Sequence, residues 1–529
     1  MARRKIPATM ATQHPDNASS PYWLSDASES FEQFADKLSS HGTRVPFRFV
    51  GGHFITANKE IEEAYLNFFE LGCEEYLWDW EGKTADANVV ERLYEKYGEE
   101  FRNRPLGRDF TLSFRIPNIW KEAEYRLAHA FVSILSSNDF AHDNGFYEPP
   151  IAETYLPMTT EANQLAYVRE KYEHIARSFQ ELKRTGPESI DVIPLVEEVG
   201  LMANADKIVG DYVRICREKN RKVSSYSDSD FRVWFARSDP AMNSGMVPSV
   251  VAVKAGMSRL AALSERTGVE FHPMIGVGCL PFRGGLSPDS VELFAKEYAG
   301  MRTVTIQSGF KYDYPKEKVI KAVAWLNADM NRKAVQYGDG VCGDAEKIID
   351  LFTAPYKKTI ESIGGDISAI AGHVPDRRER KLHIGIWGYA RSVGRHKLPR
   401  AIKFTGALYS IGIPPELIGT GRGIEEARKS GLLETLEEIY VNIRTDLAQA
   451  GNYLNRENLE RLAAAKPGYR QIEEDVRLVE EYIGQKLGPE SAEQMIHRNI
   501  TSNILLLFQK GGEISEDVVR AGEIRRSFG

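Results

Sequence analysis

The feature that most constrains the fold is an alternation of short apolar, β-branched runs with longer amphipathic stretches along most of the chain. Short strands separated by helices pair in parallel, because a parallel neighbour is reached only through a long crossover connection. Eight such runs predict a (β/α)8 barrel. The predicted strands are residues 75–80, 109–117, 151–157, 189–197, 231–239, 270–278, 303–310 and 381–389.

The connecting segments have helical spacing of apolar residues, as in 160–185, and an open doubly wound sheet is the alternative arrangement. A helix is expected at 58–71, before the first predicted strand, and 396–411 is expected to be the last barrel helix. The rest of the chain is predicted to be almost wholly helical. We therefore expect a catalytic barrel with an N-terminal segment over 1–424 and an α-helical region packed on it over 425–529.

The composition excludes several classes of protein. The chain has 529 residues, 42% of them hydrophobic and 27% charged, which are ordinary globular values. A net charge of -7 argues against a general nucleic-acid binder. The four cysteines form no CxxC pair, which argues against a disulfide scaffold or a thiolate zinc site. Without a secretory signal or a long apolar run, the sequence predicts a soluble cytoplasmic protein with no nucleic-acid or membrane partner.

Charged and polar residues follow the predicted strands. In a barrel of this type, catalytic groups gather at the carboxyl ends of the strands. Any one of these residues is more often a solvated loop charge, but together they predict a mouth that binds a divalent metal and an anionic substrate. The residues are Asp79, Glu81, Lys83, Arg115, Glu153, Glu197, Glu198, Arg237, Asp239, Gln307, Lys311 and Arg391.

Glu197 and Asp239 are the best candidates for metal ligands. They end neighbouring predicted strands, so they could share one ion. Carboxylate oxygens are hard donors that suit Mg²⁺ or Mn²⁺. The alternative is that each pairs with Arg237 or a nearby lysine. No spacing of histidines and cysteines indicates zinc.

Two glycine-rich segments, 275–285 and 418–423, could bring backbone amides to a phosphate. Arg283 and Arg422 would then add the bidentate donors of their guanidinium groups. Plain turns are the alternative, because glycines serve those as well. Neither segment has the strand–helix context of a Walker loop or a dinucleotide fingerprint.

Several long, compositionally unusual motifs resemble those of phosphoenolpyruvate carboxylase in its short archaeal-type form. The resemblance runs over nearly the whole chain. The motifs are TMATQHPDN (9–17), YLWDWEGK (76–83), FRIPN (114–118), IPLVEE (193–198), FARSDPAMNSG (235–245), IGVGCLPFRGG (275–285), TIQSGFKYDYP (305–315) and ALYSIGIPPELIGTGRG (407–423).

This resemblance implies roles for individual residues. The family's catalytic histidine corresponds to His14, and its arginines to Arg115 and Arg283. Its metal ligands correspond to Glu197 and Asp239. The implied reaction joins phosphoenolpyruvate and bicarbonate with the help of Mg²⁺ or Mn²⁺, giving oxaloacetate and phosphate through carboxyphosphate and the enolate of pyruvate. The family also implies a homotetramer.

The sequence departs from the larger members of the family at some substrate-binding cations. Their lysine in the motif around Asp239 is Met242 here, and the first arginine of their double glycine loop has no counterpart. Other cations are therefore expected to bind substrate and phosphate. The candidates are Lys83, Lys311, Arg391 and Arg422.

Closure over the site is expected from 276–285 or from a long loop over 336–380 that contains Gly364 and Gly365. Two other functions remain open at this point. One is a different metal-dependent barrel enzyme that acts on phosphoenolpyruvate or an oxo-acid without bicarbonate. The other is a catalytically idle relative that serves as a binding or assembly protein.

Overall fold

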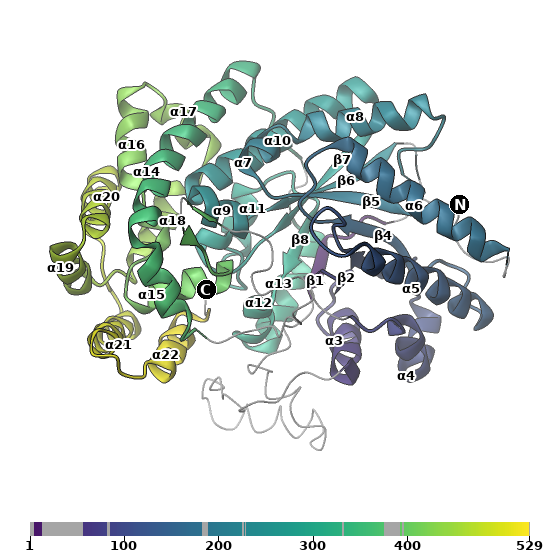
Figure 1. Ribbon diagram of the computed structural model, residues 1–529, viewed down its shortest axis with the longest axis horizontal. Helices are drawn as coiled ribbons and strands as arrows, with labels where there is room; N and C mark the ends of the chain where they lie inside the picture. The colour runs from purple at the N-terminus through teal and green to yellow at the C-terminus, as the bar shows by residue number, and fades with distance from the viewer. Residues whose placement is uncertain are drawn as a thin grey trace.

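Eight parallel strands close into a barrel (Figure 1). This computed structural model describes residues 5–12, 57–81, 85–181, 189–224, 227, 229–330, 333–374, 392–393 and 396–527. The strands follow one another around the barrel in chain order, and β1 pairs with β8 to close it. They are β1 (Thr9–Thr12), β2 (Glu75–Asp79), β3 (Thr111–Arg115), β4 (Ile151–Leu156), β5 (Asp191–Val196), β6 (Asp230–Ala236), β7 (Glu270–Gly276) and β8 (Thr303–Ile306).

Helices follow the strands and cover the outside of the barrel, as the sequence predicted. The helix candidate at 160–185 is α6, and the predicted helix before the strand at 75–80 is α3. The helices of this part are α3 (Ala57–Phe69), α4 (Val89–Asn103), α5 (Glu124–Asp143), α6 (Ala162–Gln180), α7 (Val199–Ala203), α8 (Ala205–Glu218), α9 (Ser238–Ser244), α10 (Met246–Thr267), α11 (Val291–Glu297), α12 (Ser308–Tyr312) and α13 (Lys316–Ala328), with the 3-10 turn η1 (Pro281–Arg283) before α11. The (β/α)8 barrel is confirmed.

The first strand of the barrel was missed in the sequence. β1 is only four residues long, TMAT, and lies between β2 and β8, where Met10 and Ala11 are fully buried. The predicted eighth strand, 381–389, lies outside the described residues. Since β1 already closes the barrel against β8, the assignment of 381–389 as the closing strand was wrong. Four residues are too few to show the alternation by which strands are recognised.

The barrel interior is filled with apolar side chains at mid-height. Trp234 packs edge-on against Tyr155, with ring centroids 4.8 Å apart. This inner layer is separate from the larger core between the barrel and its helices. Its members are Met10, Leu77, Tyr155, Ile193, Leu195, Trp234 and Met274. The interior is therefore a packed plug, which separates the two ends of the barrel.

A charged layer lies inside the barrel towards the amino ends of the strands. Arg232 donates from Nη2 to Oε2 of Glu75 at 2.7 Å, and also donates to Glu153. Glu153 was predicted at the carboxyl end of its strand, and this was wrong. It is the third residue of β4 and pairs in register with Asp191, the first residue of β5. The error arose because a charged residue inside a strand was taken for its end.

The C-terminal helices gather on one side of the barrel (green to yellow in Figure 1). They are α14 (Asp339–Ala371), α15 (Ala401–Ser410), α16 (Thr420–Lys429), α17 (Leu433–Ile439), α18 (Ile443–Gly451), α19 (Arg456–Ala465), α20 (Pro467–Ile483), α21 (Ala492–Gln509) and α22 (Ser515–Arg525), with η3 (Pro415–Leu417) and a short hairpin of β9 (Ser392–Val393) and β10 (His396–Lys397). The helicity predicted for 425–529 is confirmed. The segment 396–411, expected to be the last barrel helix, instead contains β10 and then α15, which packs against α14, α21 and α22.

The long loop expected over 336–380 is a helix instead. α14 runs for 33 residues through Gly364 and Gly365, and it packs against α10, α16 and α20. Its apolar residues lie on one buried face, including Ile360, Ile363 and Ile367. Tertiary packing of this face stabilises a helix despite the two glycines. This segment therefore does not supply the expected mobile loop.

One helix in the described part of the chain is long and apolar enough to cross a membrane. This helix, α10, has 83% of its most apolar window buried inside the protein. It packs against α7, α14 and β7, as a core helix does. Its hydrophobicity is accounted for by this packing.

Candidate active site

Arg115 joins two carboxylates at the carboxyl ends of β2 and β3. Asp79 and Arg115 are opposite each other in the strand register. Nε of Arg115 donates to Oδ1 of Asp79 at 2.9 Å, and Nη1 lies 2.9 Å from Oε2 of Glu81. The backbone N–H of Glu81 donates to the same Asp79 oxygen at 3.0 Å. The guanidinium is therefore held in a fixed orientation at the mouth.

The electrostatics of Arg115 connect this corner to β5. Burial opposes its positive charge, but the carboxylates of Asp79 and Glu81 outweigh that cost and hold the pKa of Arg115 well above its ordinary value. Glu197, just after β5, also raises this pKa. The structure thus brings Arg115 and Glu197, predicted from separate strands, within electrostatic range of each other.

Arg283 links the ends of three other strands. It lies in η1, after β7. Its Nε donates to Oγ of Ser238 at 3.1 Å, beyond β6, and its Nη2 donates to Oε1 of Gln307 at 2.8 Å, beyond β8. The 7% exposed Arg283 is therefore positioned by partners on both sides. Ser238 was not predicted, although it lies within the motif that contains Asp239.

The glycines around Arg283 leave no room for side chains. A Cβ on Gly278 would lie 2.9 Å from Cζ of Arg283. A Cβ on Gly284 would lie 2.4 Å from Cγ1 of Val277, and Gly284 has a φ of 121° that other residues rarely adopt. The glycine-rich segment therefore forms a tight seat for this arginine.

Glu197 and Asp239 follow adjacent paired strands. Val196 and Phe235 are in register near the ends of β5 and β6. Glu197 comes directly after β5, and Asp239 lies in the first turn of α9; both are half-buried. Their carboxylate oxygens are of the donor type that Mg²⁺ and Mn²⁺ prefer, so this pair fits a divalent cation.

Arg237, the alternative partner considered for these carboxylates, has other contacts. Its side chain is 1% exposed and donates to three neutral oxygens. These are the hydroxyl of Tyr298 at 3.1 Å and the carbonyls of Phe282 and Pro281 at 2.9 and 3.2 Å. Arg237 therefore supports the turn that carries Arg283.

Lys311 lies beyond β8, in α12, but its side chain points into the protein interior and not into the mouth. Its Nζ donates to Oε1 of Glu63 and to the backbone carbonyl of Thr12, each at 2.8 Å. Tyr76 and Tyr312 donate their hydroxyls to the same Glu63 carboxylate. The side chains of Lys311 and Glu63 are fully buried. The contacts of Lys311 thus fix the last residue of β1 in place.

Arg422 lies among the C-terminal helices and pairs with Asp475 of α20. Its Nε donates to Oδ1 of Asp475 at 2.9 Å, and the backbone N–H of Gly419 donates to Oδ2 at 2.8 Å. A Cβ on Gly421 would lie 2.2 Å from the Asp475 carbonyl oxygen. This glycine-rich segment therefore surrounds an internal carboxylate and lets α16 and α20 approach closely.

Three predicted site residues, His14, Lys83 and Arg391, lie outside the described residues. In the sequence, His14 follows the last residue of β1 by two positions. Met242 stands where the larger members of the family have a lysine. It is fully buried in α9, and its carbonyl accepts from the hydroxyl of Tyr356 at 2.8 Å.

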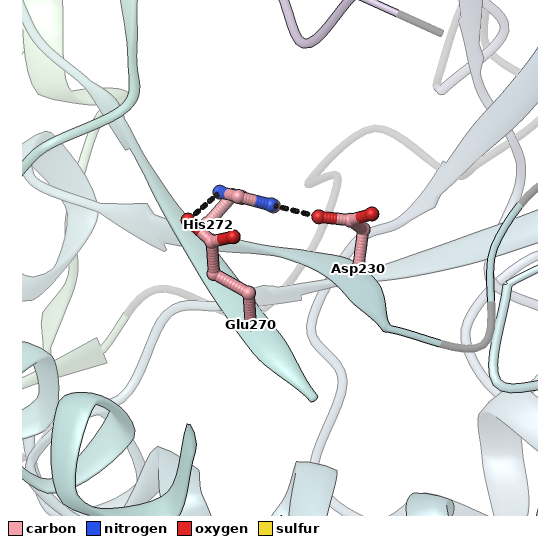
Figure 2. Close-up of side chains that lie close together, drawn as sticks. All are labelled: Asp230, Glu270 and His272. Carbon is pink, nitrogen blue, oxygen red and sulfur yellow. Dashed lines mark hydrogen bonds and ion pairs between the residues drawn. The ribbon is translucent and has the colours of Figure 1, made fainter. Parts of the chain in front are cut away.

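A second group of candidate metal ligands lies at the opposite end of the barrel. Figure 2 shows His272 between Asp230 and Glu270, at the amino ends of β6 and β7. Nε2 of His272 is 2.9 Å from Oδ1 of Asp230, whereas Nδ1 is 3.8 Å from Oε1 of Glu270. The two carboxylates face different ring nitrogens, so the geometry is that of a histidine pinned between two acids.

This chain is similar over its length to a family of known proteins. The family model described as phosphoenolpyruvate carboxylase matches residues 41–529. Phosphoenolpyruvate carboxylase of Leuconostoc mesenteroides subsp. mesenteroides is 34% identical over 539 residues, covering 100% of both chains. That of Metallosphaera sedula is 35% identical over 551 residues, 99% of this chain and 100% of the relative. That of Oenococcus oeni is 34% identical over 506 residues, 95% of this chain and 94% of the relative. The chain belongs to the phosphoenolpyruvate carboxylase family.

Proposed function

We propose that this chain carboxylates phosphoenolpyruvate with bicarbonate, giving oxaloacetate and phosphate, in an anaplerotic step of carbon fixation. The observation that carries the proposal is that two arginines at the strand ends are held in fixed orientations around one mouth, Arg115 by two carboxylates and Arg283 by a hydroxyl and an amide oxygen. Arg115 is fixed by Asp79 and acts electrostatically on Glu197, and Arg283 is fixed across the opposite strand ends. Full-length family membership supports the assignment.

In this proposal Arg115 and Arg283 bind the phosphoryl group. Guanidinium groups match phosphate oxygens geometrically, and fixed donors stabilise the charge that spreads over those oxygens during transfer. Arg115 retains 16% side-chain exposure, which leaves part of it accessible at the mouth. Bicarbonate attacks phosphorus and the bond to the enol oxygen breaks, giving carboxyphosphate and the enolate of pyruvate.

Glu197 and Asp239 would hold a divalent cation, Mg²⁺ or Mn²⁺. When bound, such a cation supplies Lewis-acid stabilisation of enolate charge without a proton transfer. We assign no other described residue to the metal.

His14 would accept the proton of carboxyphosphate, which then separates into CO₂ and phosphate. A histidine titrates near neutrality and suits this role. The enolate then forms a carbon–carbon bond to CO₂, giving oxaloacetate. Exclusion of water protects both species. The segment 276–285 was expected to close over the site, but its turn is held by Arg237 and packed tightly around its glycines, so we assign it no closing motion.

Lys83 and Arg391 are proposed as the further substrate-binding cations. Lys311 and Arg422 already have buried carboxylate partners in Glu63 and Asp475, so we give them structural roles instead. We further propose that the protein works as a cytoplasmic homotetramer, as the family resemblance implies.

A coupled assay tests the proposed function. Malate dehydrogenase and NADH report oxaloacetate, and separate reactions omit bicarbonate or the metal. NADH oxidation that requires phosphoenolpyruvate, bicarbonate and the metal together is expected. Turnover that persists without bicarbonate would instead indicate a different reaction of phosphoenolpyruvate, and binding without turnover would indicate an idle relative.

A further inference from the structure

The turn that carries Arg283 is held by a buried carboxylate from the C-terminal part of the chain. Glu416, in η3, is fully buried. Its Oε1 accepts from the backbone N–H of Phe282 at 2.9 Å and from the hydroxyl of Tyr409 at 2.9 Å. Phe282 immediately precedes Arg283, so a residue 134 positions away in the sequence fixes the backbone next to this arginine.

Arg237 holds the same turn by donating hydrogen bonds to the backbone carbonyl groups of the turn. It donates to the carbonyl of Phe282 at 2.9 Å and to that of Pro281 at 3.2 Å. The amide N–H of Phe282 is bound by Glu416 and its carbonyl by Arg237. The peptide groups on both sides of Phe282 are therefore fixed by buried charged side chains. This arrangement restricts the rotation of the backbone that aims Arg283.

The described polar contacts of Glu416 are with neutral donors. Its Oε2 is buried without a hydrogen-bond partner among the described residues. Burial raises the pKa of Glu416 to about 7. Burying a carboxylate without an ion pair is unfavourable, so packing alone does not account for an acid at this position.

Glu416 also connects the turn to more distant helices. Tyr409, its other partner, belongs to α15, and the guanidinium of Arg525 in α22 lies 5.2 Å from the Tyr409 ring centroid. The ring of Phe282 stacks on Phe404 of α15, with centroids 5.8 Å apart. A continuous set of contacts therefore runs from α22 through α15 to η1.

We propose that Glu416 is a positioning residue for Arg283, which couples the packing of the C-terminal helices to phosphoryl binding at the barrel mouth. This inference rests on the role given to Arg283 under the proposed function. It predicts that loss of the Glu416 acceptor acts on catalysis only through Arg283.

The test compares four single variants in the coupled assay. Glu416→Ala removes the acceptor, and Glu416→Asp withdraws it by one methylene with less risk to folding. Glu416→Gln keeps an acceptor oxygen for Phe282. Asp446→Asn is the matched control, because desolvation also raises the pKa of the half-buried Asp446 to about 7, but this carboxylate accepts its hydrogen bond from Tyr440 and not from the turn. Thermal melting of each variant separates folding from catalysis.

Glu416→Asp and Glu416→Ala are expected to lower kcat/KM for phosphoenolpyruvate by about 10- to 100-fold, the effect of a small misplacement of a substrate-orienting group. The kcat/KM of Glu416→Gln and of Asp446→Asn should stay within about threefold of the wild-type value. Glu416→Gln keeps the acceptor oxygen at the turn, and Asp446→Asn leaves the turn unchanged. Equal activity losses in Glu416→Gln and Glu416→Asp, or a lowered melting temperature with unchanged kcat/KM in Glu416→Asp, would overturn the positioning role.

A double-mutant cycle with Arg283→Gln distinguishes this inference from the proposed function. Glu416→Asp in the Arg283→Gln background should cause no further loss, because both changes disable the same group. Losses that multiply would refute the coupling while leaving the role of Arg283 intact. Full activity of Arg283→Gln alone would refute both the role of Arg283 and the positioning by Glu416.

Discussion

The two ends of the barrel each hold an arginine between two acids, but in different settings. At the amino end, Arg232 contacts Glu75 and Glu153, and its side chain is 3% exposed. At the carboxyl end, Arg115 contacts Asp79 and Glu81 with a side chain that is 16% exposed. The apolar plug separates the two. The same residue types therefore form an enclosed network at one end and an accessible one at the other.

The partners of each arginine explain the difference. The partners of Arg232 lie within strands, and Thr303 of β8 also accepts from it at 3.0 Å. At the carboxyl end, Glu81 lies beyond its strand, and Glu197 follows β5. Strand residues are fixed by the sheet, whereas the turns beyond them can approach a substrate. Charged side chains inside the barrel thus indicate a functional site only where further charged side chains lie on the turns that follow the strands.

The largest expected effect is at the carboxyl end. Asp239→Asn should lower the rate of metal-dependent turnover more than about a thousandfold, because Lewis-acid stabilisation of the transition state contributes several kcal/mol. The fold should be unaffected, since the side chain keeps its shape. Activity in the coupled assay and far-UV circular dichroism test this, and near-normal activity would refute the assignment of Asp239.

At the amino end, Arg232→Met should act on stability instead. It leaves Glu75 and Glu153 buried without their cation, which costs about 3–5 kcal/mol. The kcat/KM of the folded protein should stay near that of the wild type. Denaturant unfolding and the coupled assay measure the two quantities. A large loss of kcat/KM with unchanged stability would contradict the division between the two ends.

The pH dependence of stability should reflect Glu416 on the carboxyl-end side. Its pKa is raised by burial from 4.5 to about 7, so the folded state binds more protons than the unfolded state between these values. Stability should therefore fall as the pH rises from 5 to 8, by up to about 3 kcal/mol from this group. Glu416→Gln should reduce that slope in melts recorded at both pH values, and an unchanged slope would contradict the assignment.

His14→Asn should separate the two halves of the reaction. Carboxylation should fall by about 100-fold, the contribution of a positioned proton acceptor, while phosphate release is less affected. Parallel assays of phosphate and oxaloacetate test this. The expected signature is phosphate released without oxaloacetate, and an equal loss of both products would argue against the proton-transfer role.

The smallest effect is expected from His272. Its contribution makes stability rise with pH, whereas that of Glu416 makes stability fall with pH. Burial lowers its pKa, despite the hydrogen bond to Asp230, so the unfolded state binds more protons near pH 6. Its contribution to stability is present above its ordinary pKa of 6.5 and is lost as the pH falls. Melts of His272→Gln between pH 5 and 7.5 should show a weaker acid sensitivity than the wild type. Identical curves would exclude His272 as the titrating group.

Much of the fold was predictable because its signals are local. Seven of the eight predicted strands belong to the barrel, and the helical character of the C-terminal region follows from residue spacing. β1 was missed because TMAT is too short to show a period. α14 was missed because Gly364 and Gly365 favour a loop locally, whereas the buried face of the segment favours a helix.

The candidate site was only partly predictable. Arg115 and Asp79 could be assigned to the mouth, because both end predicted strands and neighbouring strands end at the same rim. Lys311 follows a strand in the same way, yet its partner Glu63 is 248 positions away and turns it inward. Nothing in the local sequence distinguishes these two cases.

The sequence by itself determined the type of barrel, seven of its eight strands and the family, because strand and helix periods and family motifs are written in neighbouring residues. Only the tertiary structure decided which charges face the mouth, since depth inside a barrel depends on the stagger of strands that are distant in sequence. It placed Glu153 at the amino end and Arg422 beside Asp475. It also brought Glu416 to the turn of Arg283, because a buried hydrogen bond is made wherever packing brings donor and acceptor together.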